Sequence, residues 1–439
     1  IRNAQTATPM VEGEEQNYDD RVRALVGESG NFSQWLCLNE ERDWVGHNKD
    51  NTRSVLRIWA GEETEEVLGR LLIKNWKLVN VPFQPEYMGN RQWNRNAPQF
   101  AITAGEAGET PHWDKILAHT ASDLDAGVKE SKWCKDNGIN NGADYLRYWI
   151  AFMFRDPYCK LPYMFFFGPQ NSGKSIIHEA LSMLVTKGVV LADEALKSKS
   201  GFNGELAGSV LCVVEETNLS PSASGGRTAY DRMKLWVTGE ELSIHAKYGQ
   251  PYQLKNTTHW LQMANDKTYC PIFPGDTRVC MAYVPMIEGA EIPKPVLMQK
   301  LREEAPAFLR GLMDMKLPPA PGRLRLPIID TESKKQAEDD VSSAVFKFIK
   351  QKCYNIDGCF TKLKDFYDAF KLHIGEEEAM DWTYNRVIDE FRKRDDVPFG
   401  RMGNNVTCLG NLSLTPLQES DDYKGVFIRH KTKLVKKGE

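Results

Sequence analysis

The sequence has no long apolar run. Its most apolar stretch, Tyr163 to Gly168, falls far short of the roughly 20 consecutive apolar residues that span a bilayer as a helix. Paired cysteines are also missing, because the nine cysteines are scattered, odd in number and without a C-x-x-C pair. These absences argue against a membrane-embedded protein, a disulfide framework and a zinc cluster. They predict reduced thiols and a cytoplasmic location.

Neither sign of charge dominates the chain. There are 56 Lys and Arg against 60 Asp and Glu, which gives a net charge of −4. This balance excludes a uniformly basic nucleic-acid coat, although a ring or channel concentrates positive charge locally within a neutral total. With 41% hydrophobic and 26% charged residues, the composition is that of a globular protein and excludes collagen-like, low-complexity and disordered classes.

The length of 439 residues predicts about two to four domains. The chain begins at Ile1 with polar residues and no Met, from which we expect the C-terminal portion of a longer polypeptide. Patterning predicts a flexible linker, an N-terminal accessory domain, a core domain, a second linker and a C-terminal domain, over residues 1–20, 21–140, 141–317, 318–334 and 335–439.

The core domain is predicted to contain a parallel sheet. Three short apolar runs bounded by polar residues or glycine have the pattern of strands covered on both faces: Met164 to Phe167, Val210 to Val214 and His259 to Met263. Helical patterns flank these runs at Asp144 to Phe154 and Leu297 to Met315. The core is therefore expected to be an α/β domain.

The C-terminal domain is predicted to be a winged-helix-like α+β domain. Helical patterns at 335–353, 361–374 and 381–394 precede a Gly/Asn-rich hairpin region at 398–415, the order of elements in a winged helix. The end is basic, with no acid from 423 to 438. Four cations of helix 381–394 are candidates for DNA contacts, or belong to a solvated or partner-docking face: Arg386, Arg392, Lys393 and Arg394.

A phosphate-binding motif, G-x-x-x-x-G-K-S, follows the first core strand. It comprises Gly168, Pro169, Gln170, Asn171, Ser172, Gly173, Lys174 and Ser175. An apolar helix is predicted directly after it, over Ile176 to Val185, so the strand–loop–helix context disfavours a chance Gly-rich turn. Such a loop presents backbone N–H groups to phosphate oxygens, while Lys174 reaches the β- and γ-phosphates and Ser175 binds Mg²⁺. The expected cofactors are ATP and Mg²⁺.

Two adjacent carboxylates, Glu215 and Glu216, follow the second core strand. Ligands of parallel sheets bind at the carboxyl ends of the strands. We assign Glu215 to the metal and Glu216 to the attacking water. Consecutive residues of a strand point to opposite faces, so the reverse assignment stays open. A solvated acidic loop is the alternative.

Three further candidates lie downstream. A hairpin predicted over Leu242 to Leu254 carries Lys247 and Tyr248 near its turn; it suits contact with a nucleic-acid backbone, but surface hairpins with a lysine are common. Asn265 ends the third core strand, where its amide can sense the γ-phosphate or the attacking water. Arg278 precedes another β-like run and is either an arginine finger acting across a subunit interface or an ordinary surface ion pair.

In this order, the phosphate loop, the Glu215–Glu216 pair, Lys247, Asn265 and Arg278 resemble the superfamily 3 helicases of DNA viruses, phages and plasmids. Upstream segments are similar to the phage and poxvirus-type primase-helicase family: Asn80-Val-Pro-Phe-Gln-Pro, Trp93-Asn-Arg-Asn, Tyr145-Leu-Arg-Tyr-Trp-Ile-Ala and Lys160-Leu-Pro. The resemblance covers roughly residues 75 to 315 and implies a P-loop AAA+-like core.

The resemblance also implies partners. The family forms rings, usually hexamers, whose ATP sites lie between subunits and whose hairpins line a channel that moves a single DNA strand. It implies a primase or primase-polymerase part outside this chain, single-stranded and forked DNA as substrates, and the cytoplasm of a bacterial host. Two departures are an insertion over Ser220 to Arg227 and Tyr248 at a position where some relatives have histidine.

The leading hypothesis is an ATP-dependent DNA helicase or translocase of a phage or plasmid replication protein. The alternative is an ATP-regulated, DNA-binding initiator or loading module without strand-displacement activity. A small-molecule kinase with the same phosphate loop is disfavoured, because it needs neither the acidic pair nor the hairpin and the trailing arginine.

Overall fold

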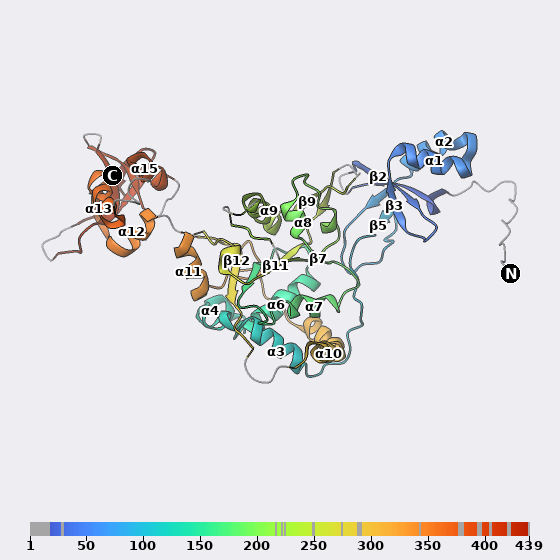
Figure 1. The fold of residues 1–439 in the computed structure, drawn as a ribbon, viewed down its shortest axis with the longest axis horizontal. Coiled ribbons are helices and arrows are strands. Elements are labelled where there is room, and N and C mark those ends of the chain that lie inside the picture. The colour runs from blue at the N-terminus through green and yellow to red at the C-terminus, as the bar shows by residue number, and fades with distance from the viewer. Residues whose placement is uncertain are drawn as a thin grey trace. The chain divides into compact units, whose positions relative to one another are not determined.

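The computed structural model describes residues 18–27, 30–215, 217–220, 223, 225–247, 251–273, 275–287, 292–341, 344–375, 382–392, 397–403, 406–418 and 423–437. Of the residues singled out above, Glu216, Tyr248, Lys393 and Arg394 lie outside these ranges. The chain forms two compact units, one from Ile1–Pro271 and Asp276–Lys335, the other from Ile272–Gly275 and Gln336–Glu439. Figure 1 labels elements of both units where there is room.

The first unit begins with a five-stranded sheet of order β3-β2-β1-β4-β5. Its strands are β1 (Val22–Val26), β2 (Phe32–Leu38), β3 (Trp44–His47), β4 (Trp76–Leu78) and β5 (Gln92–Trp93). Helices α1 (Lys49–Ala60) and α2 (Thr64–Ile73) cover one face, because Leu56, Val67 and Leu68 pack with Val22 and Trp35 in one cluster. No particular fold was predicted for this region.

The opposite face of this sheet holds a buried cation. The guanidinium of Arg23 lies 4.2 Å from the ring centroid of Trp93, 4.3 Å from that of Trp44 and 4.4 Å from that of Trp76. Arg23 is only 6% exposed, and its Nε donates to the backbone oxygen of Asp19 at 3.1 Å. The negatively charged faces of these rings compensate the cation that the sheet buries.

The second sheet of this unit is parallel throughout, with the order β12-β6-β11-β8-β7. Its strands are β6 (Tyr163–Phe167), β7 (Val189–Leu191), β8 (Leu211–Val214), β11 (His259–Ala264) and β12 (Val279–Tyr283). Every residue of β8 and β11 is buried, as expected for strands covered on both faces. The α/β fold with a P-loop AAA+-like parallel core is therefore confirmed, and accessory sheets precede and follow this core along the chain.

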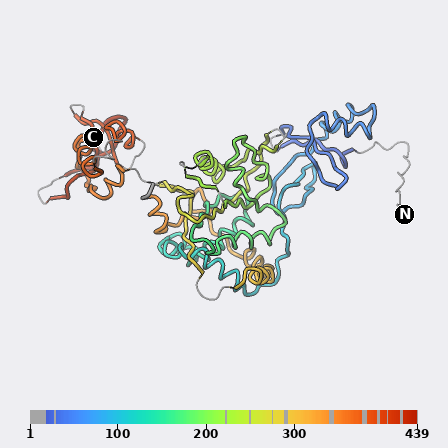
Figure 2. Tube along the Cα trace, in the orientation of Figure 1, coloured from blue at the N-terminus to red at the C-terminus, as the bar shows by residue number. Residues whose placement is uncertain are grey.

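The principal helices around this sheet are α3 (Pro111–Thr120), α4 (Asp125–Glu130), α6 (Gly142–Arg155), α7 (Ile176–Ser182), α8 (Asp193–Lys197), α9 (Gly226–Thr238) and α10 (Lys294–Asp314). Helix α10 lies beside α3, α6 and α7, although the chain between them includes most of the sheet (Figure 2). The rings of Trp113 in α3 and Phe308 in α10 stack with centroids 4.0 Å apart. This packing fixes α3 on the side of the sheet that carries the phosphate loop.

The helix after the phosphate loop is shorter than predicted. It ends at Ser182 instead of continuing to Val185. The chain leaves the helix to pair with an upstream segment: Ala101 donates its backbone N–H to Leu184 O, and Phe100 forms a bridge with Val185. These backbone hydrogen bonds replace the last helical ones.

The second unit is an α+β domain, as predicted. Its helices are α12 (Ala344–Lys352), α13 (Leu363–Ile374) and α15 (Tyr384–Arg392), and its strands are β13 (Tyr354–Lys362), β14 (Phe399–Met402), β15 (Val406–Ser413), β16 (Phe427–His430) and β17 (Lys433–Lys436). The sheet order is β13-β15-β14-β17-β16. Strands β14 and β15 form the expected hairpin, whereas α11 (Glu332–Val341) and α12 stand where one helix over 335–353 was predicted.

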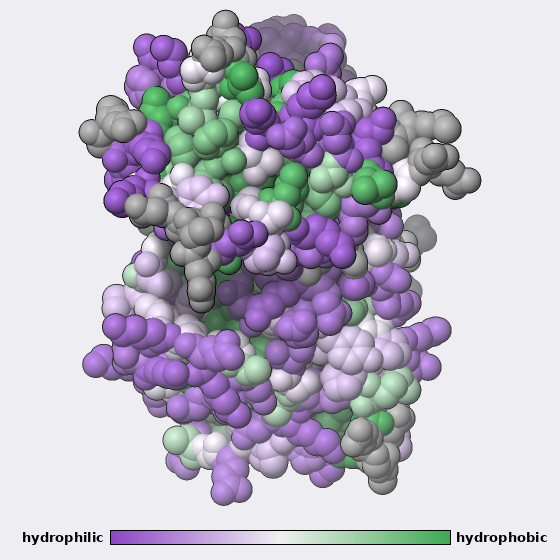
Figure 3. Space-filling model, turned by 90° about the vertical axis from the view of Figure 1, so that its left-hand side faces the viewer, coloured by the Kyte–Doolittle hydropathy of each residue, from purple (hydrophilic) through white to green (hydrophobic). Residues whose placement is uncertain are grey.

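Apolar side chains are also exposed on the molecule. Figure 3 shows a face on which green apolar groups lie among a larger purple hydrophilic area. None of the helices in the described part of the chain is both long enough and apolar enough to cross a membrane.

Candidate active site

The phosphate loop joins the carboxyl end of β6 to α7. Gly168 approaches the neighbouring chain so closely that a Cβ there would lie 2.1 Å from Val284 O. Asn171 and Gly173 adopt φ angles of 65° and 81°, the left-handed region in which glycine is unstrained. The loop conformation thus explains both glycines of the motif: Gly168 has no room for a side chain, and Gly173 lies at a left-handed turn.

Lys174 is held inside the loop. Its Nζ donates to Gly168 O at 2.8 Å and Pro169 O at 2.7 Å, and lies 3.4 Å from the side-chain oxygen of Asn265. Burial lowers the pKa of this ammonium, since the residue is only 7% exposed. The contact joins the loop after β6 to the end of the adjacent strand β11, so Lys174 and Asn265 lie together as a phosphate site requires.

The carboxylate of Glu215 lies beside the helix that follows the loop. Its Oε1 is 3.1 Å from Nε2 of His178 on α7. Burial lowers the pKa of His178, and the Glu215 carboxylate opposes that shift. Ser175 directly precedes α7 and makes no capping hydrogen bond with its side chain. The Ser175 hydroxyl and the Glu215 carboxylate are hard oxygen donors, which fits Mg²⁺ bound by few protein groups together with phosphates.

Asp193 is a residue that the sequence analysis missed. It follows β7, and its carboxylate accepts three hydrogen bonds. The donors are the backbone N–H of Glu215, at 3.2 Å, and the backbone N–H and the hydroxyl of Thr217, both at 2.7 Å. The Thr217 carbonyl accepts Nε2 of Gln262 at 2.9 Å, and Gln262 in turn accepts the hydroxyl of Tyr163 at 3.0 Å. This chain of hydrogen bonds ties the segment after β8 to β7, β11 and β6.

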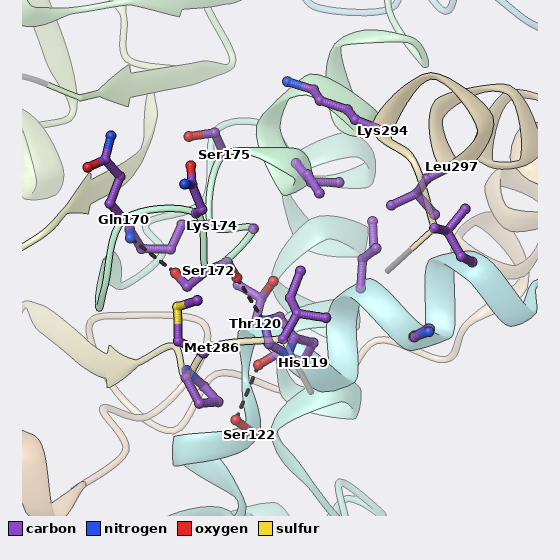
Figure 4. Close-up of a pocket in the computed structure, with 18 of the residues that line it drawn as sticks. His119, Thr120, Ser122, Gln170, Ser172, Lys174, Ser175, Met286, Lys294 and Leu297 are labelled. Carbon is purple, nitrogen blue, oxygen red and sulfur yellow. Dashed lines mark hydrogen bonds between the residues drawn. The ribbon is translucent and has the colours of Figure 1, made fainter. Parts of the chain in front are cut away.

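A cavity of about 940 Å³ opens beside the loop, within the size range of small-molecule sites. Its walls include Ile116, His119, Thr120, Ile287 and Leu297. Figure 4 shows Gln170, Lys174 and Ser175 on one side of it and Lys294 and Leu297 on another. His119 on α3 contacts the loop directly, because its Nε2 lies 2.8 Å from Ser172 O. Its role was not predicted, since α3 precedes the loop by many residues.

The predicted hairpin is present. Strands β9 (Glu241–Ile244) and β10 (Tyr252–Lys255) pair antiparallel, with Ile244 opposite Tyr252. Lys247 is exposed beyond β9, while Tyr248 lies outside the described residues. Lys247 is not among the described residues that line the phosphate-loop cavity.

Arg278 lies at the other end of the sheet from the phosphate loop. Its carbonyl accepts the N–H of Tyr163, the first residue of β6, whereas the loop follows the last residue of β6. Its Nε is buried and has no hydrogen-bond partner among the described residues. The Asp276 carboxylate accepts its backbone N–H at 2.8 Å, which fixes the backbone but not the guanidinium. Within one chain, Arg278 is therefore not brought together with Lys174.

Comparisons with known proteins agree with this fold. Residues 166–278, from β6 to Arg278, match the model of a family of unknown function (DUF5906). No curated protein matches the chain by sequence.

Three solved structures of one protein have a similar fold. An A-form apo structure of the NrS-1 C-terminal region aligns with a TM-score of 0.54 and 13% identity over 88% of this chain and 96% of that one. A second apo structure of that region gives 0.53 and 15%, covering 90% and 96%. A further A-form structure gives 0.55 and 14%, covering 86% and 93%. At this identity the likeness concerns the fold.

Proposed function

We propose that this protein is an ATP-dependent DNA helicase or translocase, the C-terminal part of a phage or plasmid replication protein. One observation carries the proposal: Lys174 in its phosphate loop, Asn265 after β11 and Glu215 after β8 lie at the carboxyl ends of three neighbouring parallel strands. A phosphoryl-transfer site needs a phosphate cradle, a metal-binding oxygen and a group that orients water, all at one edge of a sheet.

Each residue has a separate task in this proposal. Lys174 exchanges its bonds to Gly168 O and Pro169 O for the β- and γ-phosphate oxygens of ATP. Ser175 and Glu215 hold Mg²⁺, which when bound neutralises charge that develops on the phosphates. Glu216 or Glu215 polarises the attacking water, and Asn265 orients it next to Lys174.

The position of Arg278 supports a site shared between subunits. Four residue steps along β6 separate Tyr163, beside Arg278, from Phe167, which leads into the loop. At about 3.3 Å per residue, this places Arg278 more than about 13 Å from its own loop. An arginine that completes the ATP site must then come from another copy of the chain, which explains the need for a ring, in our proposal a hexamer.

Two further features support the proposal. The hairpin β9–β10 carries the exposed Lys247 in the segment between its strands, which offers a cation for contact with single-stranded DNA. The fold is shared with a region that is itself the C-terminal region of NrS-1. This supports our proposal that the chain works as part of a longer replication protein, with a primase or primase-polymerase activity elsewhere.

A strand-displacement assay tests the proposal. We expect the protein to separate a forked DNA duplex only with ATP and Mg²⁺, Lys174→Ala to abolish separation, and Lys300→Ala, an exposed lysine of α10, to leave it intact. Separation that persists in Lys174→Ala would contradict the helicase. Assembly and DNA binding without separation by the unaltered protein would favour the ATP-regulated initiator or loading module instead.

A further inference from the structure

Charge is divided unevenly within the C-terminal unit. The described residues from Val397 to the end of the sheet, 397–403, 406–418 and 423–437, contain no Asp or Glu. They contain Arg401, Lys424, Arg429, Lys431, Lys433, Lys436 and Lys437. The helices of the unit carry acids as well as bases, for example Asp365 and Asp368 in α13 and Asp389 and Glu390 in α15. Among the described residues, positive charge is therefore concentrated on β14, β16 and β17, whereas β13 of the same sheet carries Asp357.

The fold brings Arg401, which is distant in the sequence, next to the basic strands β16 and β17. Strand β14 pairs with β17 in parallel, with Arg401 in register with Lys433, and the N–H of Arg401 donates to Thr432 O at 2.8 Å. Strands β16 and β17 form a hairpin whose turn contains Lys431. We call Arg401, Arg429, Lys431 and Lys433 the basic edge; all four are exposed.

The hairpin of the basic edge is anchored. Phe427 and Leu434 are 3% and 4% exposed and pack against Cys408 of β15 in one apolar cluster. Arg429 Nε donates to Lys431 O at 3.2 Å, across the turn. The four cations are thus presented on a fixed backbone, so little backbone entropy is lost when they bind a rigid partner.

No carboxylate among the described residues lies within ion-pair distance of the basic edge. Arg429 of the basic edge lies 6.0 Å from the ring centroid of Phe399, and the arginines of α15 also have partners. The guanidinium of Arg386 lies 4.1 Å from the ring centroid of Trp382, and Arg392 pairs with Asp389 at 2.9 Å. Among the described residues, β14, β16 and β17 carry an exposed basic surface, and the alternatives for helix 381–394 stay open because Lys393 and Arg394 lie outside these residues.

We infer that the basic edge binds the phosphodiester backbone of DNA. Several like charges held next to one another repel, and a polyanion relieves that repulsion while releasing its condensed counterions. Neighbouring strands lie about 4.8 Å apart, so Arg401 and Lys433 can contact phosphates of one DNA strand together. Contacts of this kind position the protein without reading base sequence. The inference needs no ATP hydrolysis and stands apart from the proposed motor.

Salt-dependent binding of labelled DNA by the full chain, without ATP, tests this inference. The test variant is Arg401→Glu/Lys431→Glu/Lys433→Glu, and the matched control Lys347→Glu/Lys352→Glu/Lys364→Glu reverses three exposed lysines of α12 and α13. Single-stranded and duplex DNA of equal length are titrated in parallel at several salt concentrations. The form that loses more affinity in the test variant identifies the strand state that the basic edge prefers.

We expect the test variant to bind at least about tenfold more weakly at low salt and to reduce the slope of log K against log salt by about 2 to 3, since each phosphate contact contributes roughly 0.7 to 0.9. The control should keep the slope of the unaltered protein. Equal losses in test and control would overturn the inference, as would loss of binding to an acidic polypeptide with unchanged binding to DNA.

Four further measurements keep the result interpretable. The neutral variant Arg401→Gln/Lys431→Gln/Lys433→Gln should lose a smaller part of the slope than the reversed one, and thermal unfolding should show both variants folded. ATP turnover without DNA should be unchanged in the test variant, and Lys174→Ala should keep the DNA affinity of the basic edge. Failure of the proposed motor would leave these two results intact, so the two ideas fail separately.

Discussion

The Asp193 carboxylate accepts both the backbone N–H and the hydroxyl of Thr217, at 2.7 Å each, and the N–H of Glu215 at 3.2 Å. It therefore holds the backbone on either side of position 216. A carboxylate whose work is to position catalytic neighbours should affect turnover more than substrate binding, because a displacement of about 1 Å can cost about 100-fold in rate.

We predict that Asp193→Ala lowers kcat for ATP by about 10- to 100-fold and leaves KM nearly unchanged. Asp193→Asn should lose less, since one oxygen still accepts both bonds from Thr217. The control is Asp125→Ala, whose carboxylate accepts the N–H of Gly142 and so pins the start of α6. Steady-state kinetics test this prediction. An equal fall in kcat in both alanine variants, or a changed KM with constant kcat in Asp193→Ala, would contradict a positioning role for Asp193.

Gly168 gives a second prediction. A Cβ at Gly168 would meet Val284 O at 2.1 Å, so Gly168→Ala must displace the loop or the chain at Val284. We expect ATP affinity to fall at least about tenfold, because backbone N–H groups lose their alignment with phosphate oxygens. Gly311→Ala in α10 meets nothing within 4 Å and should leave affinity unchanged. Nucleotide binding by calorimetry separates them; normal affinity in Gly168→Ala would argue against this loop as the phosphate site.

The strand order explains what the sequence predicted and what it could not. The phosphate loop and strands β6, β8 and β11 were predictable because each rests on a local pattern: an apolar run, a glycine motif and an apolar helix. Asp193 was not, since its partners are more than 20 residues away and meet it only because β7 and β8 are neighbours. A carboxylate directly after a short apolar strand was its only signal in the sequence.

Other failures have different physical causes. Strand β1 contains Arg23, whose burial is tolerated only because Trp44, Trp76 and Trp93 arrive from other strands. The sequence predicts a basic tail at β16 and β17, but Phe427 and Leu434 in these strands form the buried side of a hairpin. In both cases tertiary contacts override what local composition indicates.

A mixing experiment tests the proposed sharing of the ATP site. Arg278→Ala and Lys174→Ala should each be inactive alone, because one lacks the finger and the other the phosphate lysine. When equal amounts are mixed, about a quarter of the interfaces should combine an intact loop with an intact Arg278, and turnover should return to that extent. Full activity of Arg278→Ala alone, or no recovery in the mixture, would contradict a shared site.

His259 predicts a pH dependence of stability. It is fully buried in β11, where Nδ1 donates to Val210 O at 2.9 Å, and burial lowers its pKa to about 4. In the unfolded chain the histidine pKa is about 6.5, so as the pH falls His259 takes up a proton in the unfolded chain before it does so in the folded one. The free energy of unfolding therefore keeps its full value above about pH 6.5. It decreases as the pH falls towards 4, by about 3 kcal/mol in total.

Urea unfolding between pH 4 and 7.5 checks this prediction. His259→Asn keeps a donor near Val210 O but does not titrate, so the difference in unfolding free energy between the two proteins should shrink as the pH falls. Parallel curves for the two proteins would show that the protonation of His259 is not coupled to folding.

In our proposal, ATP hydrolysis at the phosphate loop of Lys174 is coupled to DNA in an assembly of several chains. The most direct measurement is ATP turnover with and without single-stranded DNA, as the protein concentration is raised through the micromolar range. We predict that DNA stimulates turnover and that the rate per chain rises steeply with protein concentration, with neither effect in Lys174→Ala. A rate per chain that is unaffected by DNA and by protein concentration would contradict the account.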